Sequence, residues 1–448
     1  MYLAERENDN FVLNVSKVFS SRILIRVLSL GTSIIIARIL GPGGQGVVTL
    51  VLMVPFSLSI IGELGIESAN IYYTSKKGIK RENIIGNSLL LSILWTLFLV
   101  AVLIMVIPYI HDKFLQGTDL YLIFIALLIF PIDFFVTTLR GVIIGEHRVN
   151  FYNMLFIINI TATFIFTALL VLLFKIGVVG AVIANLSGSL AGALLIYFGY
   201  LSKEKVRVRF SFPDLRKQLF YGVMPYFANL FGFLNYRIDI FIVSYFLDIR
   251  QVGYYALAIA LTSKIHELPQ SIMTIFFPLT SSQSEAEKLV YTPNIFRKSG
   301  FLMIFLGVVI IALARPGIIF VFGRDFIDSV VAFILLVLGR IIIRGNVGIL
   351  SSDICGRGKP YIITLISAVL LPISIGLNIL LIPIYGIVGA AFVSIIVSTI
   401  QEVAVIFAYL RVSNVNFSDL IMNYSDIRFV FSEIKGYTGR LLHGRLKG

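Results

Sequence analysis

The sequence predicts an all-α polytopic membrane protein, and three properties of the chain lead to this fold class. Hydrophobic residues make up 58% of its 448 residues and charged residues make up 14%, whereas soluble domains contain about 25% charged residues. The mean hydropathy is +0.95. Apolar stretches long enough to span a bilayer, about 20 residues each, recur along the chain. A water-soluble enzyme, a secreted disulfide scaffold and a disordered chain are therefore excluded.

Twelve apolar stretches are long enough to be transmembrane helices. Glycines interrupt some of them, as Gly62 and Gly65 do in the second stretch. The connections are short, and the longest runs from Tyr200 to Asp214, so none of them is long enough to be a soluble catalytic domain. The expected helices lie at residues 15–39, 47–75, 84–108, 119–145, 150–174, 178–200, 215–247, 251–281, 296–322, 326–354, 360–384 and 387–411.

The positive charges are distributed unequally between the two sides of the membrane. With the N-terminus inside, the inner connections contain 17 lysine and arginine residues and the outer connections contain six. This bias predicts a multi-pass protein of the cytoplasmic (inner) membrane with both termini in the cytoplasm. It also accounts for most of the net charge of +13 without a nucleic-acid partner. The basic tail, 412–448, either lies near anionic lipid headgroups or is a solvated extension.

Several kinds of site have no signature in the sequence. The single cysteine, Cys355, excludes an intrachain disulfide and a CxxC metal or redox site, and the four histidines are too scattered to suggest a metal centre. A Gly-rich phosphate loop is missing, so ATP hydrolysis is not expected. The first fourteen residues mix both charge signs, so no cleaved leader is expected.

The two halves of the chain resemble one another at four places, in order and at offsets of 207 to 211 residues. We therefore expect two six-helix lobes, 1–210 and 211–411. Because six is even, both lobes begin on the same side of the membrane and form a parallel repeat, as in many alternating-access transporters. A duplicated scaffold without transport activity is the alternative. The four aligned places are 34–40 and the following Gly46 with 241–247 and the following Gly253, Pro108 with Pro316, 145–148 with 356–359, and 177–181 with 386–390.

Pairs of arginines lie at bilayer depth, where ionisable groups usually face a cavity or a partner. Arg22 and Arg26 are four residues apart, so they share one face of the first helix and repel each other. A polyanionic ligand would relieve this repulsion, and snorkelling to the inner headgroups is the alternative. Arg340 and Arg344 repeat the spacing in the tenth helix. The alternative to ligand binding for these two arginines is pairing with acids of a neighbouring helix.

Further charges lie in the second, seventh and eighth expected helices. Lys264 and Glu267 are three residues apart and form either a local ion pair or a pair that faces the cavity. Arg237 and Asp239 are two apart, so they point to different faces of the seventh helix and each needs its own partner. Glu63 lies between glycines that let a ligand approach. It is expected either to take up a proton or to make a structural hydrogen bond.

Short motifs in both halves resemble those of polysaccharide-exporter and O-antigen-type flippases, over about 1–411. This resemblance implies membership of the multidrug/oligosaccharidyl-lipid/polysaccharide exporter superfamily. It also implies a cavity between the lobes lined by helices one, two, seven and eight. Lipid II flippases of that superfamily have fourteen spans, so the expected twelve make a peptidoglycan precursor a less favoured substrate. The motifs lie at 21–46, 221–225, 237–239, 252–255, 277–278, 322–323 and 386–391.

The resemblance and the charges together predict a flippase that moves a polyprenyl-(pyro)phosphate-linked oligosaccharide outward by alternating access, for cell-surface polysaccharide biosynthesis. The expected partners are this glycan, membrane lipids and, as further candidates, polysaccharide-assembly proteins. No enzymatic activity, cofactor or bound metal is expected. The expected substrate-binding residues are Arg22, Arg26, Arg237, Lys264, Arg340 and Arg344. The expected coupling residues, for H⁺ or Na⁺, are Glu63, Asp239 and Glu267.

Three other functions compete with this interpretation. A cation-coupled multidrug exporter would favour a cavity dominated by acids and aromatic residues, because drugs are often cationic. A membrane-embedded polysaccharide polymerase or ligase would need a sizeable outer loop, which the short connections do not offer. A pore or structural anchor would not need so many charges of both signs at bilayer depth.

Overall fold

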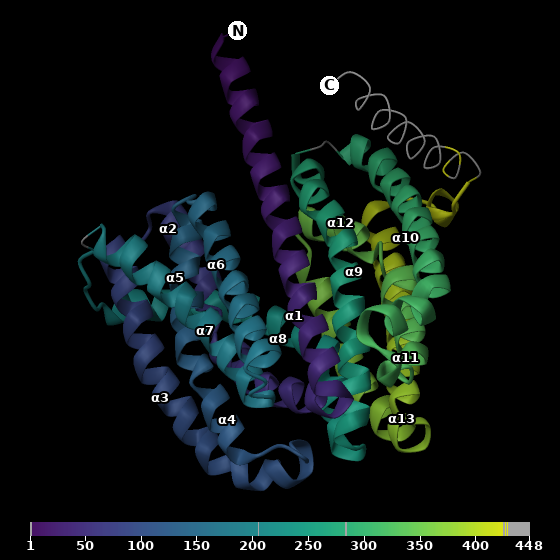
Figure 1. Cartoon of the computed structure of the whole chain (residues 1–448). Coiled ribbons are helices and arrows are strands. Elements are labelled where there is room, and N and C mark those ends of the chain that lie inside the picture. The colour runs from purple at the N-terminus through teal and green to yellow at the C-terminus, as the bar shows by residue number, and fades with distance from the viewer. Residues whose placement is uncertain (1, 205, 283–284, 424–425, 427, 429–448) are drawn as a thin grey trace, which may run out of the picture. The chain divides into compact units, whose positions relative to one another are not determined.

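The computed structural model describes residues 2–204, 206–282, 285–423, 426 and 428. It describes their side chains from residue 24 onward, except at 268 and 270–286. These residues form helices, turns and loops, with no strand among them. The predicted all-α fold class is confirmed (Figure 1).

The first part of the chain forms seven α-helices, two of which continue as π-helical turns. Their order follows the first six predicted spans closely. They are α1 (Tyr2–Gly62), α2 (Ile66–Lys76), α3 (Arg81–Phe114), α4 (Leu120–Leu127), α5 (Ile129–Gly145), α6 (Val149–Thr167) with η1 (Ala168–Leu173), and α7 (Val178–Ile196) with η2 (Tyr197–Ser202).

The remaining helices follow the last six predicted spans. They are α8 (Phe212–Phe246), α9 (Ile249–Ser282), α10 (Glu285–Phe322), η3 (Arg324–Phe326), α11 (Ser329–Val337), η4 (Leu338–Ile343), α12 (Val347–Gly356), α13 (Pro360–Ser413) and η5 (Phe417–Leu420).

Two long helices each run from one predicted span into the next. The backbone of α1 leaves helical geometry at Gly41, where φ is 64°, and that of α13 does so at Gly386, where φ is 59°. Glycine occupies such positive φ angles without a steric penalty. These bends divide spans one and two, and spans eleven and twelve.

Hydropathy and length support the membrane assignment. Within the described residues, seven helical segments are long and apolar enough to cross a membrane. The count becomes eight when Ser329–Ile343 and Val347–Gly356, bent by 41°, form one span. Because α1 and α13 each run from one predicted span into the next, these segments cover ten of the twelve. The other two predicted spans, 215–247 and 251–281, correspond to α8 and α9, which are not among these apolar segments.

The second predicted span, 47–75, is not one continuous helix. It breaks after Gly62, where Leu64 and Gly65 have φ angles of 49° and 69°. The indole nitrogen of Trp95 donates a 3.0 Å hydrogen bond to the carbonyl oxygen of Gly62, one of the oxygens that a helix end leaves without a backbone partner. Glu63 therefore lies in non-helical backbone.

The chain packs as two compact units. The N-terminal unit comprises Met1–Phe233 and Leu247–Gly253, and the C-terminal unit comprises Leu234–Phe246 and Tyr254–Gly448. The boundary between the units falls inside α8. The repeat-based lobe limits, 1–210 and 211–411, stay a prediction.

Buried amides explain why the first half of α8 belongs to the N-terminal unit. Asn87 Nδ2 donates to Gln218 Oε1 at 2.8 Å, and Gln218 Nε2 donates to Asn70 Oδ1 at 2.7 Å. Asn70 Nδ2 in turn donates to Ser88 Oγ at 2.8 Å. All four side chains are fully buried. This network ties α8 to α2 and α3.

The start of the predicted tail packs against the C-terminal unit. Val415 and Leu420 are buried, and Arg297 on α10 forms a 2.9 Å ion pair with Asp426. This part of the tail is therefore not a solvated extension. The rest of the tail lies outside the described residues.

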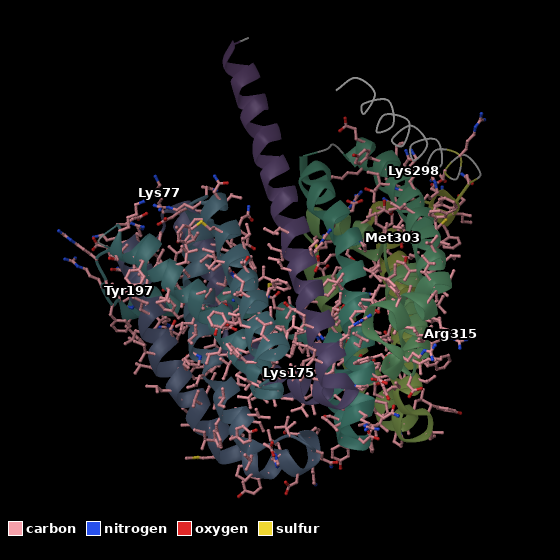
Figure 2. All side chains as sticks on the ribbon, in the orientation of Figure 1. Lys77, Lys175, Tyr197, Lys298, Met303 and Arg315 are labelled. Atoms are coloured by element: carbon pink, nitrogen blue, oxygen red, sulfur yellow. The ribbon has the colours of Figure 1, made fainter. Side chains whose placement is uncertain are left out.

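Large apolar side chains remain exposed on many helices, as expected where lipid covers them. They include Leu97, Met105, Phe320 and Leu380. Figure 2 shows Lys298 and Arg315 at separate positions along α10. The fold is that of a multi-pass membrane protein.

Candidate functional site

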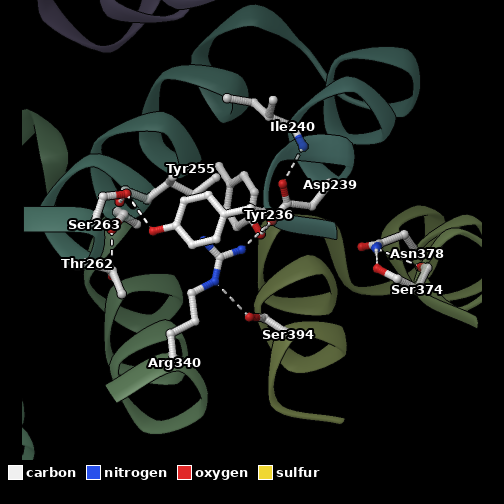
Figure 3. A network of polar contacts seen from close by, with 12 residues as sticks. Tyr236, Asp239, Ile240, Tyr255, Thr262, Ser263, Arg340, Ser374, Asn378 and Ser394 are labelled. Atoms are coloured by element: carbon white, nitrogen blue, oxygen red, sulfur yellow. Dashed lines mark hydrogen bonds and ion pairs between the residues drawn. The ribbon is translucent and has the colours of Figure 1, made fainter. Parts of the chain in front are cut away.

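The C-terminal unit holds a buried ion pair between Asp239 on α8 and Arg340 in η4. The exposed fractions of these residues are 5% and 4%. Arg340 Nη2 lies 2.9 Å from Asp239 Oδ2, and Tyr255 donates its hydroxyl to the same oxygen at 2.6 Å. The backbone N–H of Ile240 donates to Asp239 Oδ1 at 2.9 Å. Figure 3 shows the arrangement. Both carboxylate oxygens therefore have partners.

Aromatic and hydroxyl groups hold the guanidinium of Arg340 in place. Its central carbon lies 4.4 Å from the ring centroid of Tyr236, a cation–π distance. Arg340 Nε donates to Ser394 Oγ at 3.1 Å, and the Tyr236 hydroxyl donates to Ser263 Oγ at 2.8 Å. Arg237, on the same helix as Tyr236, lies 5.5 Å from that ring. Tyr236 is therefore in contact with two arginines.

A small polar cavity of about 20 Å³ adjoins this pair. Arg344 lines it, together with Ser374, Asn378 and Ser398, and Asn378 Nδ2 donates to the carbonyl oxygen of Ser374 at 2.8 Å. The cavity is about large enough for one water molecule. It lies beside the π-helical turn η4, a kind of irregularity that is frequent at functional sites.

The N-terminal unit holds a larger cavity of about 420 Å³. It lies among α1, α5, α6 and α7. Glu63, Asp133 and Arg140 line it, with apolar surface from Phe56 and Phe156. The volume falls within the range of about 300–1,000 Å³ for small-molecule sites.

The charge of Arg140 is matched by an acid on a different helix. Arg140 Nε and Nη2 donate to the two carboxylate oxygens of Glu67, on α2, at 2.5 and 2.6 Å. A bidentate arginine–carboxylate pair is among the stronger side-chain interactions. Glu67 and Arg140 are 73 residues apart in the sequence, so no spacing along one helix predicts that they pair.

The structure brings together some of the predicted site residues. Asp239 and Arg340, expected in coupling and in substrate binding, form one ion pair, so Arg340 follows the alternative of pairing with a neighbouring acid. Arg344 lines the adjacent cavity, and Glu63 lines the cavity of the N-terminal unit. Arg237 is half-buried beside Tyr236.

The other predicted residues lie elsewhere. Arg26 is half-buried on α1, Lys264 is half-buried on α9, and Glu267 is exposed on α9. Arg22 is part of α1, but its side chain lies outside the described ones. The roles of these four residues stay predictions. Within the described residues, no group of histidine, cysteine and carboxylate side chains is arranged to hold a metal ion.

The long apolar helices define the class of protein, a multi-pass membrane protein, and comparison with known proteins identifies the family. A model of the polysaccharide biosynthesis protein family matches residues 11–284. The chain belongs to this family, which confirms the resemblance found in the motifs.

Two relatives have similar sequences. An uncharacterized membrane protein of Methanocaldococcus jannaschii is 24% identical over 66% of this chain and 63% of its own length. A probable low-salt glycan biosynthesis flippase of Haloferax volcanii is 25% identical over 55% of each chain. The chain thus spans less than two thirds of the length of either relative.

Two solved structures have a similar fold. A lipid II flippase in an inward-closed conformation superposes with a TM-score of 0.71, at 20% identity, over 89% of this chain and 90% of its own. A MATE multidrug-resistance transporter in an inward-facing conformation gives a TM-score of 0.71, at 16% identity, over 87% and 94%. The chain therefore shares the fold of these two membrane proteins.

Proposed function

We propose that the protein flips a polyprenyl-(pyro)phosphate-linked oligosaccharide across the cytoplasmic membrane, with both termini in the cytoplasm, for cell-surface polysaccharide biosynthesis. The observation that carries the proposal is the family match over residues 11–284. A relative described as a probable glycan biosynthesis flippase and the fold of a lipid II flippase support it. Movement follows alternating access, as the two-unit transporter fold suggests.

The phosphates of the substrate are held by cations near the start of each half. Arg22 and Arg26 on α1 and Lys264 on α9 are the main candidates, and Arg237 and Arg344 are further candidates. Arg340 is a weaker candidate than the sequence suggests, because Asp239 already neutralises its charge. A phosphate would have to compete with a buried carboxylate for this guanidinium.

Coupling to H⁺ or Na⁺ uses carboxylates inside the membrane, with Glu63, Asp239 and Glu267 as candidates. Glu63 lines a cavity of about 420 Å³ and is accessible to an ion. Asp239 takes an external cation only when Arg340 moves away, since the two are 2.9 Å apart. Glu63 is therefore the first coupling residue to test.

The test is flipping in proteoliposomes. The full chain is reconstituted with a fluorescent lipid-linked oligosaccharide, with and without a proton or sodium gradient. Arg26→Ala and Lys264→Ala are expected to slow flipping at least tenfold, while Lys175→Ala, in a predicted outer connection, leaves the rate unchanged. Normal flipping by both Arg26→Ala and Lys264→Ala would remove the phosphate-binding role.

A cation-coupled multidrug exporter is the second candidate. Its support is the MATE fold similarity and a cavity with two carboxylates and two phenyl rings, a combination that suits cationic drugs. Ethidium efflux from proteoliposomes distinguishes the two functions. The exporter moves ethidium and not the lipid-linked glycan, and the flippase does the reverse.

A further inference from the structure

The 420 Å³ cavity of the N-terminal unit combines opposite kinds of surface. Phe56 on α1 and Phe156 on α6 present apolar rings that are 48% and 39% exposed. Ser59, Asn159 and Asp133 add a hydroxyl, an amide and a carboxylate to the same lining. A ligand with apolar faces and several hydroxyl groups fits such a surface.

The charge of the lining determines which part of a lipid-linked glycan fits. Among the described residues, the lining carries two carboxylates, Glu63 and Asp133, and one guanidinium, Arg140. Glu67 neutralises Arg140 with two hydrogen bonds. Among these lining residues the one cation therefore already has a carboxylate partner, so a phosphate would have to compete with Glu67 for it, and this disfavours a phosphate in the cavity.

From this geometry we propose that the cavity is a glycan subsite. It binds uncharged sugar rings of the substrate and leaves the phosphates to cations elsewhere in the protein. The inference rests on the proposed flippase function, and it adds a binding site and a sugar class to it. Sugar hydroxyls donate to Glu63 and Asp133 and exchange hydrogen bonds with Asn159, while the C–H face of a pyranose packs on Phe156.

The size of the cavity favours a sugar over an ion. Its volume of about 420 Å³ is many times the roughly 10–15 Å³ that one water molecule needs on the same measure. A proton or an alkali cation needs only a small part of this space, whereas one or two sugar rings use it.

The position along the helices suits capture from the inner leaflet. Arg140 lies five residues before Gly145, where α5 ends, so it is about 8 Å from that end at 1.5 Å per residue. The charge bias assigns this end to the cytoplasm. A sugar that enters from the cytoplasm therefore reaches the cavity after a short path.

Two variants and one matched control test the subsite. Phe156→Ala removes a ring that lines the cavity, and Asp133→Asn removes a charge from it. Phe166→Ala is the control, because Phe166 lies on the same helix with a similar exposed fraction, 40%, outside the lining. The full chain in nanodiscs is titrated with bare polyprenyl pyrophosphate and with probes carrying glucose, N-acetylglucosamine or glucuronic acid disaccharides.

The wild type is expected to bind at least one uncharged glycosylated probe about tenfold more tightly than the bare pyrophosphate. Phe156→Ala and Asp133→Asn are expected to abolish this difference without changing the affinity for the bare lipid. Phe166→Ala behaves like the wild type, and the glucuronic acid probe gains nothing from its sugars.

Several results would overturn the subsite. The first is equal affinity of the wild type for bare and glycosylated probes, which leaves the flippase function standing. The second is an equal loss of affinity for the bare and the glycosylated probes in the cavity variants, which indicates a general disturbance of the protein's structure. A wild type that binds neither lipid but binds tetraphenylphosphonium refutes the proposed function itself, together with the subsite.

Discussion

Gly46 and Gly253, which the internal repeat aligns with one another, lie in direct backbone contact. A Cβ atom on either glycine would lie 3.1 Å from the backbone nitrogen of the other. A two-fold relation between repeated segments produces this self-matched kind of contact, in which each residue meets its own counterpart. The contact joins α1, after its bend at Gly41, to the first turns of α9.

Substitution of either glycine is expected to destabilise the protein. A Cβ on Gly253 would lie 1.9 Å from the carbonyl oxygen of Pro42, and one on Gly46 would lie 2.1 Å from that of Ile249. Gly253→Ala should cost about 1–3 kcal/mol through overpacking. Gly43→Ala is the control, since its Cβ meets nothing closer than 3.9 Å. Thermal unfolding in detergent measures both, and equal melting temperatures would contradict the close contact.

Loss of Gln218 is expected to loosen the first half of α8 from the N-terminal unit. Gln218→Ala leaves the buried Oδ1 of Asn70 and the buried Nδ2 of Asn87 without the partner that Gln218 provides, and each such group costs about 1–3 kcal/mol. Lys217→Ala is the matched neighbour, because that side chain is 59% exposed and its ion pair with Asp214 contributes little. Hydrogen exchange at 212–222 should rise in Gln218→Ala alone. Unchanged protection would show that the network does not hold α8.

Acid is expected to weaken a charge cluster at the ends of α3, α5 and η2. Arg81 and Arg148 both donate hydrogen bonds to Glu204. Burial by itself raises the pKa of the Glu204 carboxyl, but these hydrogen bonds lower it by more, so the pKa lies below its usual value of 4.5.

A depressed pKa means that Glu204 stabilises the folded state fully above about pH 4.5 and that this contribution is lost as the pH falls through the folded-state value. The melting temperature of the wild type should therefore drop more steeply below pH 4.5 than that of Glu204→Gln. Parallel pH profiles for the two proteins would rule out a contribution from Glu204.

Removal of Arg340 is expected to be more harmful than removal of both partners of its ion pair. Arg340→Gln leaves the buried carboxylate of Asp239 without its counter-ion, at a cost of about 3–5 kcal/mol. The double variant Asp239→Asn with Arg340→Gln should recover much of this loss. Unfolding of the two single variants and the double variant gives the coupling energy. Additive losses would show that the two groups do not depend on each other.

The sequence predicts the helices of this fold better than it predicts the contacts of its charges. Hydropathy locates twelve spans because each needs about 20 apolar residues, and Gly41 and Gly386 then bend the chain between spans. The repeat aligns Gly46 with Gly253 but does not show that they touch.

Charge pairing depends on which helix faces meet, and spacing along one helix does not report this. Arg340 and Arg344 share a spacing with Arg22 and Arg26, yet Arg340 finds its acid 101 residues away. Arg140 and Glu67 are 73 residues apart, so no local sequence pattern predicts that they pair. The amide of Gln218 likewise has no pattern in the sequence that predicts its burial.

Glu67 is expected to set the sugar preference of the proposed glycan subsite through Arg140. Glu67→Gln removes the negative charge that neutralises the guanidinium, so the cavity of the N-terminal unit becomes less negative and exposes a cation. The glucuronic acid probe should then bind several-fold more tightly than it binds to the wild type, because Arg140 is free to pair with the uronate. The affinity for the uncharged probes should change little.

Glu82→Gln, which removes an acid at the start of α3 in a 3.6 Å pair with Arg209, serves as the control. Equal effects of the two substitutions on the glucuronic acid probe would show that the cavity charge does not select the sugar.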